Sequence, residues 1–549
     1  MPHRHTLAPF ALLISCAACS GGPTQAPLLT CDAAHTQQLA PLPVGGYRFA
    51  TLPCLTLAAN SSTTDSAEYL IVAQSAAGTP GYHSAFQLRS SAAGAATFAQ
   101  LQPALAGARS SVAAQFDAFL RESGRSVAAP AARAAAMAAS VAGAEGVVTA
   151  PPVVGDSRTF MVCATVTCSS FATVTAPARI VSGHVAIYVD PAAPPGGVDS
   201  AYLDSLGQIF DQRVYAVDTS AFGHESDIDH NQVVAVLMTG VVNAMVKSEE
   251  CQTAGYVAGF FYPGDIFPGP NPFPHTPGEV MYTLVPDPDG TLSCPHTRAR
   301  VKELLPPTLL HELEHMISYN QHVIVQASRP EQTWLDEALA KYAEELGGRT
   351  FLPDSTPFLS YADGDLYDAS VYLEAPGDHY LVTPTDQDLG DVGAGWLFMR
   401  YVVDQFGSSI PRALVTGTNA TGRDNLTLHT GMSFATLTAR WALANWVSDL
   451  PAFNAPPDLT YRSWPFRATY ASLHAQDTVG RFPLPFPLVP VVTAGSPVSL
   501  SGVLRAGSGV YVRCLQPPGG GAVTLAFSAP GPVVLDPLVV PQFAVVRIR

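Results

Sequence analysis

The sequence has 549 residues, of which 47% are hydrophobic and 13% charged, and its mean hydropathy is +0.18. This composition excludes a disordered protein, and the length exceeds one hydrophobic core, so about two to four folded domains are expected. The net charge of −16 and the pI near 5.3 argue against nucleic acid and anionic membrane surfaces as partners, because both require a basic patch.

The first residues have the pattern of an export signal. A short basic start precedes an apolar run from Leu7 to Ile14, which is too short to span a bilayer. The segment LISC, ending at Cys16, resembles the lipobox of bacterial lipoproteins, and CAAC, ending at Cys19, is a second and poorer candidate. We predict a lipoprotein-type signal over residues 1–19. The alternative is ordinary signal cleavage with incidental cysteines.

Four regions are expected after the signal. Residues 20–92 alternate apolar and polar in short runs, which predicts a β-sandwich-like domain. Residues 93–156 are Ala-rich and contain one amphipathic helix, SVAAQFDAFLRES, within a linker. Residues 157–465 begin with strands such as HVAIYVD and VVAVLMTG and become helical after Pro307. Short apolar strands return in residues 470–549, which predicts a C-terminal β-domain.

Seven cysteines lie beyond the signal. Export implies an oxidising compartment, although sequence alone does not determine disulfide connectivity. The economical arrangement joins neighbours in the sequence and leaves the last cysteine free. It pairs Cys31 with Cys54, Cys163 with Cys168 and Cys251 with Cys294, and leaves Cys514 unpaired.

The segment TLLHELEHMIS concentrates charge within an apolar helix. Residues four apart share a helix face, so His311 and His315 can reach one zinc ion together. Glu312 is rotated by about 100° and can contact a water on that zinc. The alternative is a chance arrangement on a solvated helix face. Glu314 counts against a metal site, because the middle positions of such helices are usually uncharged.

A catalytic zinc site requires a third protein ligand. The segment TWLDEALAKYAEEL begins 18 residues after His315 and has the apolar spacing of a helix, on which Glu337 can return to the two histidines. The alternative, an exposed helix carboxylate, fits Glu344 and Glu345 better.

Two local capping signals accompany these helices. Thr308 follows two prolines and could cap the start of the histidine helix. Ser328 and Glu331 form a candidate capping box for the next helix.

HELEH followed by WLDEALA resembles the gluzincin metallopeptidases, in which HExxH is completed by a glutamate on the next helix. The flanking AGWLFMRYVVDQFG, SDIDHNQVVAVLMT and YVAGFFYPGDIF are most similar to the hyicolysin family of secreted bacterial peptidases. The resemblance spans roughly residues 157–450. It implies that His311, His315 and Glu337 bind zinc (Zn2+) and that Glu312 is the general base.

The resemblance also implies an α+β fold. We expect a zincin-like zinc metallopeptidase domain over residues 157–465, in which a mixed sheet precedes a helical subdomain with the HExxH helix. N- and C-terminal all-β domains would flank this domain.

Two features depart from the relatives. Aminopeptidases of this class have a Gly-Met-Glu-Asn segment that holds the substrate amino terminus, whereas the comparable strand here, PGEVMYTL, lacks it, which favours an endopeptidase. Relatives also supply a Tyr or His to the oxyanion, and Val392 stands at the position where a Tyr is expected. Tyr372, His379 and Tyr380 are substitutes that the sequence does not rank.

The segment SDIDHNQ is a second candidate for metal binding. Asp227, Asp229 and Asn231 alternate as at the start of a calcium (Ca2+) loop. Gln232 replaces the glycine of that loop and Met238 its twelfth position, so the segment is not an EF-hand. The alternative is a polar turn before a strand.

These features predict an exported zinc peptidase that hydrolyses peptide bonds with metal-activated water, and whose substrates are extracellular proteins or peptides. We expect it at the cell surface, where a lipid anchor would be its only contact with the membrane. Without the anchor it would be secreted. The alternative function is a non-catalytic surface-binding lipoprotein on a peptidase scaffold. The intact set of four site residues argues against it. The sequence does not define the oligomeric state.

Overall fold

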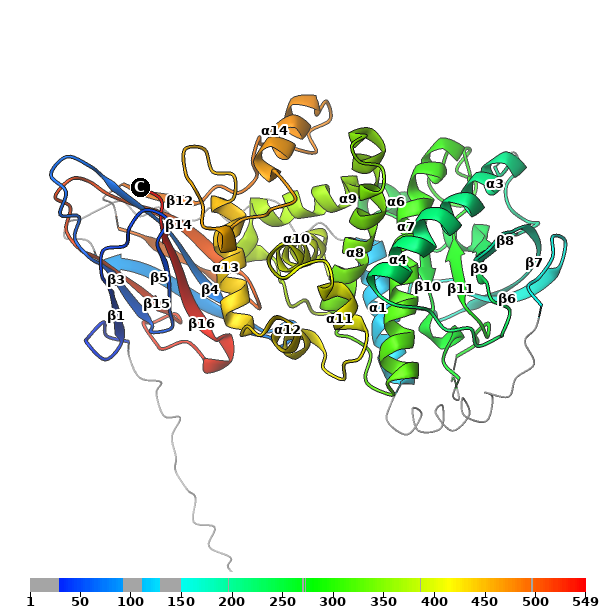
Figure 1. Ribbon diagram of the computed structural model, residues 1–549, viewed down its shortest axis with the longest axis horizontal. Helices are drawn as coiled ribbons and strands as arrows, with labels where there is room; N and C mark the ends of the chain where they lie inside the picture. The colour runs from blue at the N-terminus through cyan, green and yellow to red at the C-terminus, as the bar shows by residue number, and fades with distance from the viewer. Residues whose placement is uncertain are drawn as a thin grey trace, which may run out of the picture.

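The computed structural model describes residues 29–91, 111–128, 150–195, 197–268, 271, 273–385, 387–494 and 497–549. It is a mixed α+β structure with three parts along its long axis (Figure 1). A β-sandwich lies at one end, a group of helices in the middle, and a six-stranded sheet with its own helices at the other end. The predicted signal and both candidate acylated cysteines lie outside the described residues.

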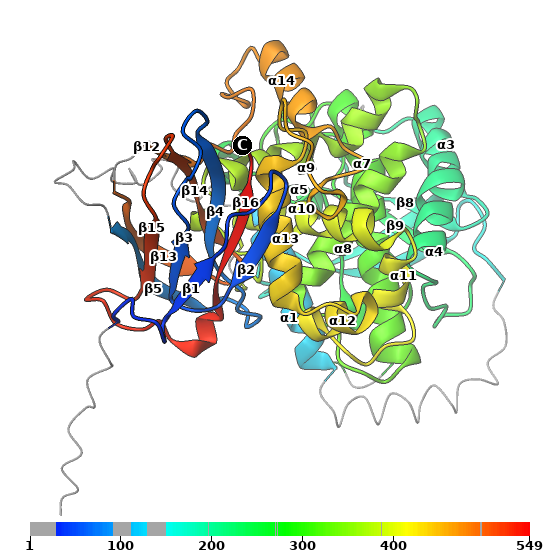
Figure 2. The same ribbon diagram turned by 60° about the vertical axis from the view of Figure 1, so that its left-hand side comes forward.

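The two all-β domains expected at the ends of the chain are one sandwich in the structure (Figure 2). One sheet has the order β1 (Thr36–Leu39), β3 (Cys54–Leu57), β15 (Val523–Ser528), β5 (His83–Ser91), β13 (Ser499–Arg505). The other has the order β12 (Val491–Ala494), β14 (Gly509–Gln516), β4 (Ala67–Ser75), β16 (Pro541–Arg547), β2 (Tyr47–Ala50).

The N-terminal and C-terminal strands of the sandwich depend on each other for backbone hydrogen bonds. Strand β4 is buried along its whole length and lies between two C-terminal strands, whereas β15 lies between two N-terminal strands. Neither segment can therefore satisfy its central strand alone. Alternating hydrophobicity predicted the strands correctly, but it does not identify the partner of a strand.

The mixed sheet has the order β10-β11-β9-β8-β7-β6. Its strands are β6 (Ser157–Cys163), β7 (Phe171–Val181), β8 (Val185–Val189), β9 (Val234–Met238), β10 (Gly259–Phe261) and β11 (Val280–Thr283). Strands β8, β9 and β11 run parallel, whereas β10 is an antiparallel edge strand. Between β8 and β9 the chain forms α3 (Ser200–Ile209), a π-helical turn over Phe210–Tyr215 and α4 (Ala216–Ala221).

The helix with both histidines, α7 (Arg298–Tyr319), begins ten residues earlier than the predicted cap at Thr308. Its N-cap is Thr297, and the Thr308 hydroxyl donates to the Leu304 carbonyl at 2.8 Å. Buried Val301 and Leu305 give the first turns a core face, so the helix continues through its two prolines. The predicted cap at Thr308 is wrong.

Four long helices belong to the middle part of the molecule. They are α8 (Thr333–Arg349), α9 (Ser355–Glu374), α10 (Leu389–Phe406) and α13 (Phe434–Val447). Shorter helices complete the set: α5 (Gly240–Asn243), α6 (Ser248–Ala254), α11 (Ile410–Val415), α12 (Gly422–Thr430) and α14 (Phe466–Gln476). Gln332 is the N-cap of α8, so the predicted capping box is wrong. Buried Glu331 instead accepts hydrogen bonds from the Gly422 amide and the Asn425 side chain.

The predicted helix of the Ala-rich region is α1 (Val112–Val127), with Ser111 as its N-cap. It packs against the mixed sheet and α7: the Phe116 and Phe260 rings meet edge to face at 5.1 Å, and the Tyr319 hydroxyl donates to the Gly124 carbonyl at 3.2 Å. This helix is therefore part of the packed body and not of a free linker.

The structure contains the three disulfides expected from sequence neighbours, and Cys514 is free and buried. Among the described residues, no helix is long and apolar enough to cross a membrane.

The Cys251–Cys294 disulfide closes the largest of the three loops, with a sequence separation of 43. Closing a loop of this length restricts the unfolded chain by about 4 kcal/mol, so Cys251→Ser should lower the free energy of unfolding by about 2–4 kcal/mol. Denaturant titration measures the difference. Peptide mapping without reduction that finds both cysteines as free thiols would contradict the pairing.

Candidate metal centre

The structure brings together the three residues that the sequence analysis proposed as ligands. His311 and His315 lie on α7 and Glu337 on α8, and all three are buried. The two histidine Nε2 atoms are 3.1 Å apart. The Glu337 carboxylate oxygens lie 3.5 Å from His311 Nε2 and 3.6 Å from His315 Nε2.

This spacing fits a zinc ion. Ligand atoms at the ~2.0–2.1 Å zinc bond length sit about 3.3–3.4 Å apart in a tetrahedron. Glu337 Oε1 is buried and accepts no hydrogen bond from the described residues, which would be costly without a cation. The residues present therefore fit the metal that the donor set implies.

Two further carboxylates hold the histidine rings. Glu344 Oε1 lies 2.9 Å from His311 Nδ1, and Asp336 Oδ2 lies 3.0 Å from His315 Nδ1. Such contacts fix the ring orientation and leave each Nε2 directed at the metal position. The sequence analysis did not single out Asp336. Glu344 is two helical turns beyond Glu337, and this spacing could have identified it.

The expectation that Glu344 and Glu345 are exposed is wrong. Glu344 is 9% exposed and Glu345 fully buried, because α7, α9 and α10 enclose α8. Glu345 pairs with Arg349 at 2.6 Å and with Arg400 at 3.2 Å. The helix therefore has no solvated face where these residues lie.

Replacing a ring-holding carboxylate should weaken zinc binding without removing a ligand. We expect Glu344→Gln and Asp336→Asn to reduce zinc affinity about 10- to 100-fold, because the rings lose their fixed orientation. Competition with a zinc chelator measures the change. Glu303→Gln, at an exposed position on the same helix as the histidines, is the matched control. Unchanged affinity in both variants would contradict this role.

Glu312 is held by the edge of the mixed sheet. Its Oε2 accepts a hydrogen bond from the Phe261 amide of β10 at 2.9 Å, in a buried setting. The strand beside the site is therefore β10. The segment PGEVMYTL contains β11, which lies inside the sheet between β10 and β9. The segment Gly259–Phe261 also lacks the Gly-Met-Glu-Asn pattern.

Glu314 is a buried acid beside the candidate metal centre, 3.6 Å from His315 Nδ1. It is fully buried, and burial, together with the charges of Asp336 and Asp218, raises its pKa well above the usual value. A raised pKa favours the uncharged form of this carboxyl group, which limits the negative charge that Glu314 brings to the middle of the motif.

The candidate ligands compensate each other's charge. Burial lowers the pKa of His311, but hydrogen bonds with Glu337 and Glu344 outweigh it and hold that pKa well above the usual value. Burial likewise raises the pKa of Glu337, but His315 and His311 hold it well below the usual range. The carboxylate thus strongly favours a positive neighbour, a role that a divalent cation also fills.

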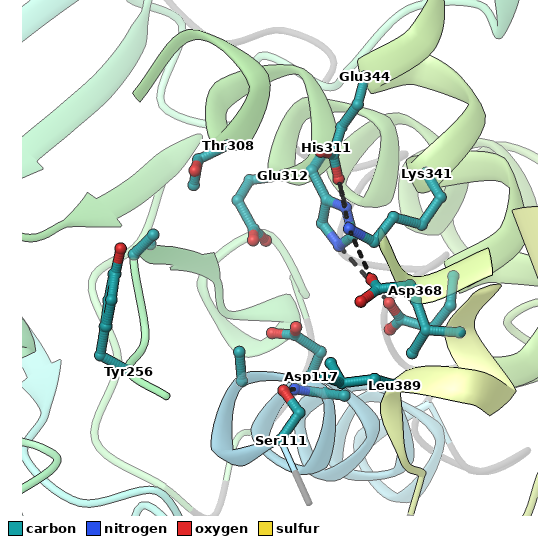
Figure 3. Close-up of a pocket in the computed structure, with 16 residues that line it drawn as sticks. Ser111, Asp117, Tyr256, Thr308, His311, Glu312, Lys341, Glu344, Asp368 and Leu389 are labelled. Atoms are coloured by element: carbon teal, nitrogen blue, oxygen red, sulfur yellow. Dashed lines mark hydrogen bonds and ion pairs between the residues drawn. The ribbon is translucent and has the colours of Figure 1, made fainter. Parts of the chain in front are cut away.

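A cavity of about 170 Å3 lies beside the candidate metal centre (Figure 3). His311, Glu312 and Glu337 line it, together with side chains from α1, α9, α10 and the segment before β10. Val392 is among them, as are Tyr256 and Lys341, which the sequence analysis did not single out.

The three candidate oxyanion donors do not line this cavity. Tyr372 stacks on Trp441, the His379 ring contacts Asp388 at 2.9 Å, and the Tyr380 hydroxyl lies 3.2 Å from His83. The structure brings none of these three side chains to Glu312.

Comparison with known proteins finds a distant similarity over part of the chain. The chain is 27% identical over 143 residues to the neutral metalloprotease ShpI of Staphylococcus hyicus. The chain is distantly similar to a metalloprotease. The match covers 26% of this chain and 30% of the relative, so it extends over less than a third of that protein. No profile of a known protein family matches the chain.

In the structure, Glu279 takes the place of Asn231 among the residues of the candidate calcium site. Single oxygens of Asp227, Asp229 and Glu279 lie within 4.8 Å of one another, so Glu279, before β11, joins the two aspartates. Asn231 is not part of this group, because its side chain donates to Asp229 at 2.9 Å and accepts from the Val233 amide. The sequence could not reveal Glu279, which is about 50 residues away along the chain.

Proposed function

We propose that the protein is a zinc-dependent peptidase. The observation that carries the proposal is the convergence of His311, His315 and Glu337. The two histidine Nε2 atoms are 3.1 Å apart, and each has one Glu337 oxygen at 3.5–3.6 Å. Glu312 lies on the helix of the two histidines. The distant similarity to a metalloprotease supports the same activity. Catalytic zinc sites combine three protein ligands with one open position, which suits this donor set.

Zinc, when bound, supplies Lewis acidity to a water molecule and to the scissile carbonyl. Glu312 then acts as the general base: it takes the proton of the attacking water and passes it to the leaving amine. The Phe261 amide holds one oxygen of Glu312, which fixes the carboxylate beside the cavity. Glu344 and Asp336 keep the imidazoles in the tautomers that zinc binding requires.

The finer assignment is a gluzincin of the hyicolysin type, with a zincin-like domain over residues 157–465 and endopeptidase specificity. The glutamate ligand on α8, one helix beyond the histidines, supports the gluzincin arrangement. Endopeptidase activity is supported by β10, which has no glutamate to hold a substrate amino terminus.

We place the enzyme outside the cell, attached by lipid at Cys16 or Cys19 and acting on extracellular proteins. The apolar run before LISC and the three disulfides support export. We expect cells that express the protein to attach a labelled fatty acid to it. A mature protein that takes up no label and is free in the medium would contradict the anchor.

The activity is tested with casein. The zinc-loaded full chain is incubated with casein, before and after metal removal by a chelator. Its Asp117→Asn variant, which loses a carboxylate that lines the cavity, is treated in the same way. We expect peptide release that stops on zinc removal and returns with added zinc. No cleavage by either zinc-loaded protein would leave the non-catalytic binding protein as the better description.

A calcium ion at Asp227, Asp229 and Glu279 is the second proposed metal. Glu279 is 2% exposed, and its Oε2 accepts no hydrogen bond from the described residues. Among the described residues, Arg158 lies 3.1 Å from Asp229, and no basic side chain forms an ion pair with Asp227 or Glu279. Calcium binds six to eight oxygens at about 2.3–2.6 Å, which suits such a group.

Calcium should raise the melting temperature of the zinc-loaded protein, and Glu279→Gln should remove this response. Asp204→Asn, which changes an exposed carboxylate on α3, is the matched control. A melting temperature that is the same in calcium and in a calcium chelator would favour the polar turn instead.

A further inference from the structure

Helix α1 lies directly against the proposed zinc centre. Ser111, Ala114 and Asp117 form one wall of the cavity whose opposite wall contains His311 and Glu312. Figure 3 shows the Asp117 carboxylate pointing from α1 into the cavity, toward Glu312 and His311. Burial, and then the charges of Glu337 and Glu312, raise the pKa of Asp117 to about 8. Asp117 lies outside the group of His311, His315 and Glu337, whose ligand atoms are within 4.8 Å of one another, so its side chain has to move toward a bound ion to reach it.

Two arginines of α1, one buried and one half-buried, contact the elements around the site. Arg121, 5% exposed, donates through Nη2 to the Phe261 carbonyl at 3.0 Å and lies 4.0 Å from Asp336. Arg125 donates to the Glu331 carbonyl. These contacts attach α1 to the segment that holds Glu312 and to the helix that carries Glu337.

Helix α1 leaves too little room for a peptide. The cavity of about 170 Å3 is smaller than the ~300–1,000 Å3 of ligand pockets. Extended peptides commonly bind by pairing with a free sheet edge, and β10 is such an edge. At Phe261 this edge is already used, because Glu312 takes the amide and Arg121 takes the carbonyl.

We propose that Asp117 is an intramolecular ligand of the zinc ion, and that α1 excludes substrate until it moves away. A carboxylate oxygen is a normal zinc ligand, and the proposed centre has one open position. Substrate binding would then be an exchange in which the Asp117 carboxylate leaves and makes room for the attacking water and the scissile carbonyl. This inference rests on the proposed function and adds its regulation.

Cobalt substitution tests the inference without measuring turnover. Cobalt(II) replaces the metal in the full chain, and its visible absorption spectrum reports the number and type of ligands. We expect Asp117→Asn to change the spectrum of the substrate-free protein. Acetohydroxamate, a small metal ligand, should bind the variant at least about tenfold more tightly, because the competing carboxylate is gone. Hydrolysis of a short fluorogenic peptide should rise by a similar factor.

Glu122→Gln is the matched control, because it removes a carboxylate from the exposed side of the same helix. Its spectrum and acetohydroxamate affinity should equal those of the wild type. Asp117→Ala provides a second variant, and circular dichroism checks that each is folded.

The possible failures can be told apart. If wild type and Asp117→Asn bind one cobalt ion each with the same spectrum and the same acetohydroxamate affinity, the inference is wrong and the zinc centre stands. If Asp117→Asn instead changes the preference for basic substrate side chains and leaves the spectrum unchanged, Asp117 contacts the substrate and not the metal. That result would also overturn the inference. If neither protein binds cobalt, the proposed function itself fails.

Discussion

Glu312→Gln should abolish peptide hydrolysis and leave zinc bound. Glutamine keeps the size of the side chain and can still accept the Phe261 amide hydrogen bond, but it cannot take a proton from water. General base catalysis contributes about 100- to 10,000-fold, and we expect a loss of activity of at least this size. Rates on casein and zinc per chain after dialysis are measured on the same preparation.

Glu303→Gln is the control for this change, because it removes an exposed carboxylate from the same helix. It should keep both zinc and activity. Activity retained in Glu312→Gln would refute the mechanism, whereas loss of zinc would show that Glu312 contributes to metal binding.

Glu337→Ala should lose zinc together with activity. Two histidines on one helix remain, and two ligands hold zinc poorly compared with three. We expect less than a tenth of a zinc ion per chain after dialysis, and the same for His311→Ala and His315→Ala. Elemental analysis of the dialysed protein gives the value.

Glu345→Gln distinguishes ligand loss from general damage to α8. It changes a buried carboxylate on the same helix that pairs with Arg349 and Arg400, away from the cavity. We expect it to be less stable but to retain zinc. Full zinc in Glu337→Ala would remove this residue from the metal centre.

The sequence was sufficient for the local geometry of the site. The helical period alone places His311 and His315 on one face, and a helix, a turn and a second helix can return Glu337 to them. The same applies to the disulfides, because cysteines close in sequence are also the easiest to bring together.

The sequence could not predict which distant segments meet. Strand β4 finds its partners more than 400 residues away, so two expected β-domains are one sandwich. The burial of Glu344 depends on three other helices, and the position of α1 depends on contacts with β10 and α7. Hydrophobic periodicity reports that a face is covered and carries no information on what covers it.

Anomalous X-ray scattering at the zinc absorption edge tests the central claim most directly. We predict one peak in crystals of the zinc-loaded full chain, about 2.0–2.2 Å from the Nε2 atoms of His311 and His315 and from a carboxylate oxygen of Glu337. A peak at another group, such as His379, Asp388 and Asp391, with none between α7 and α8 would contradict the assignment.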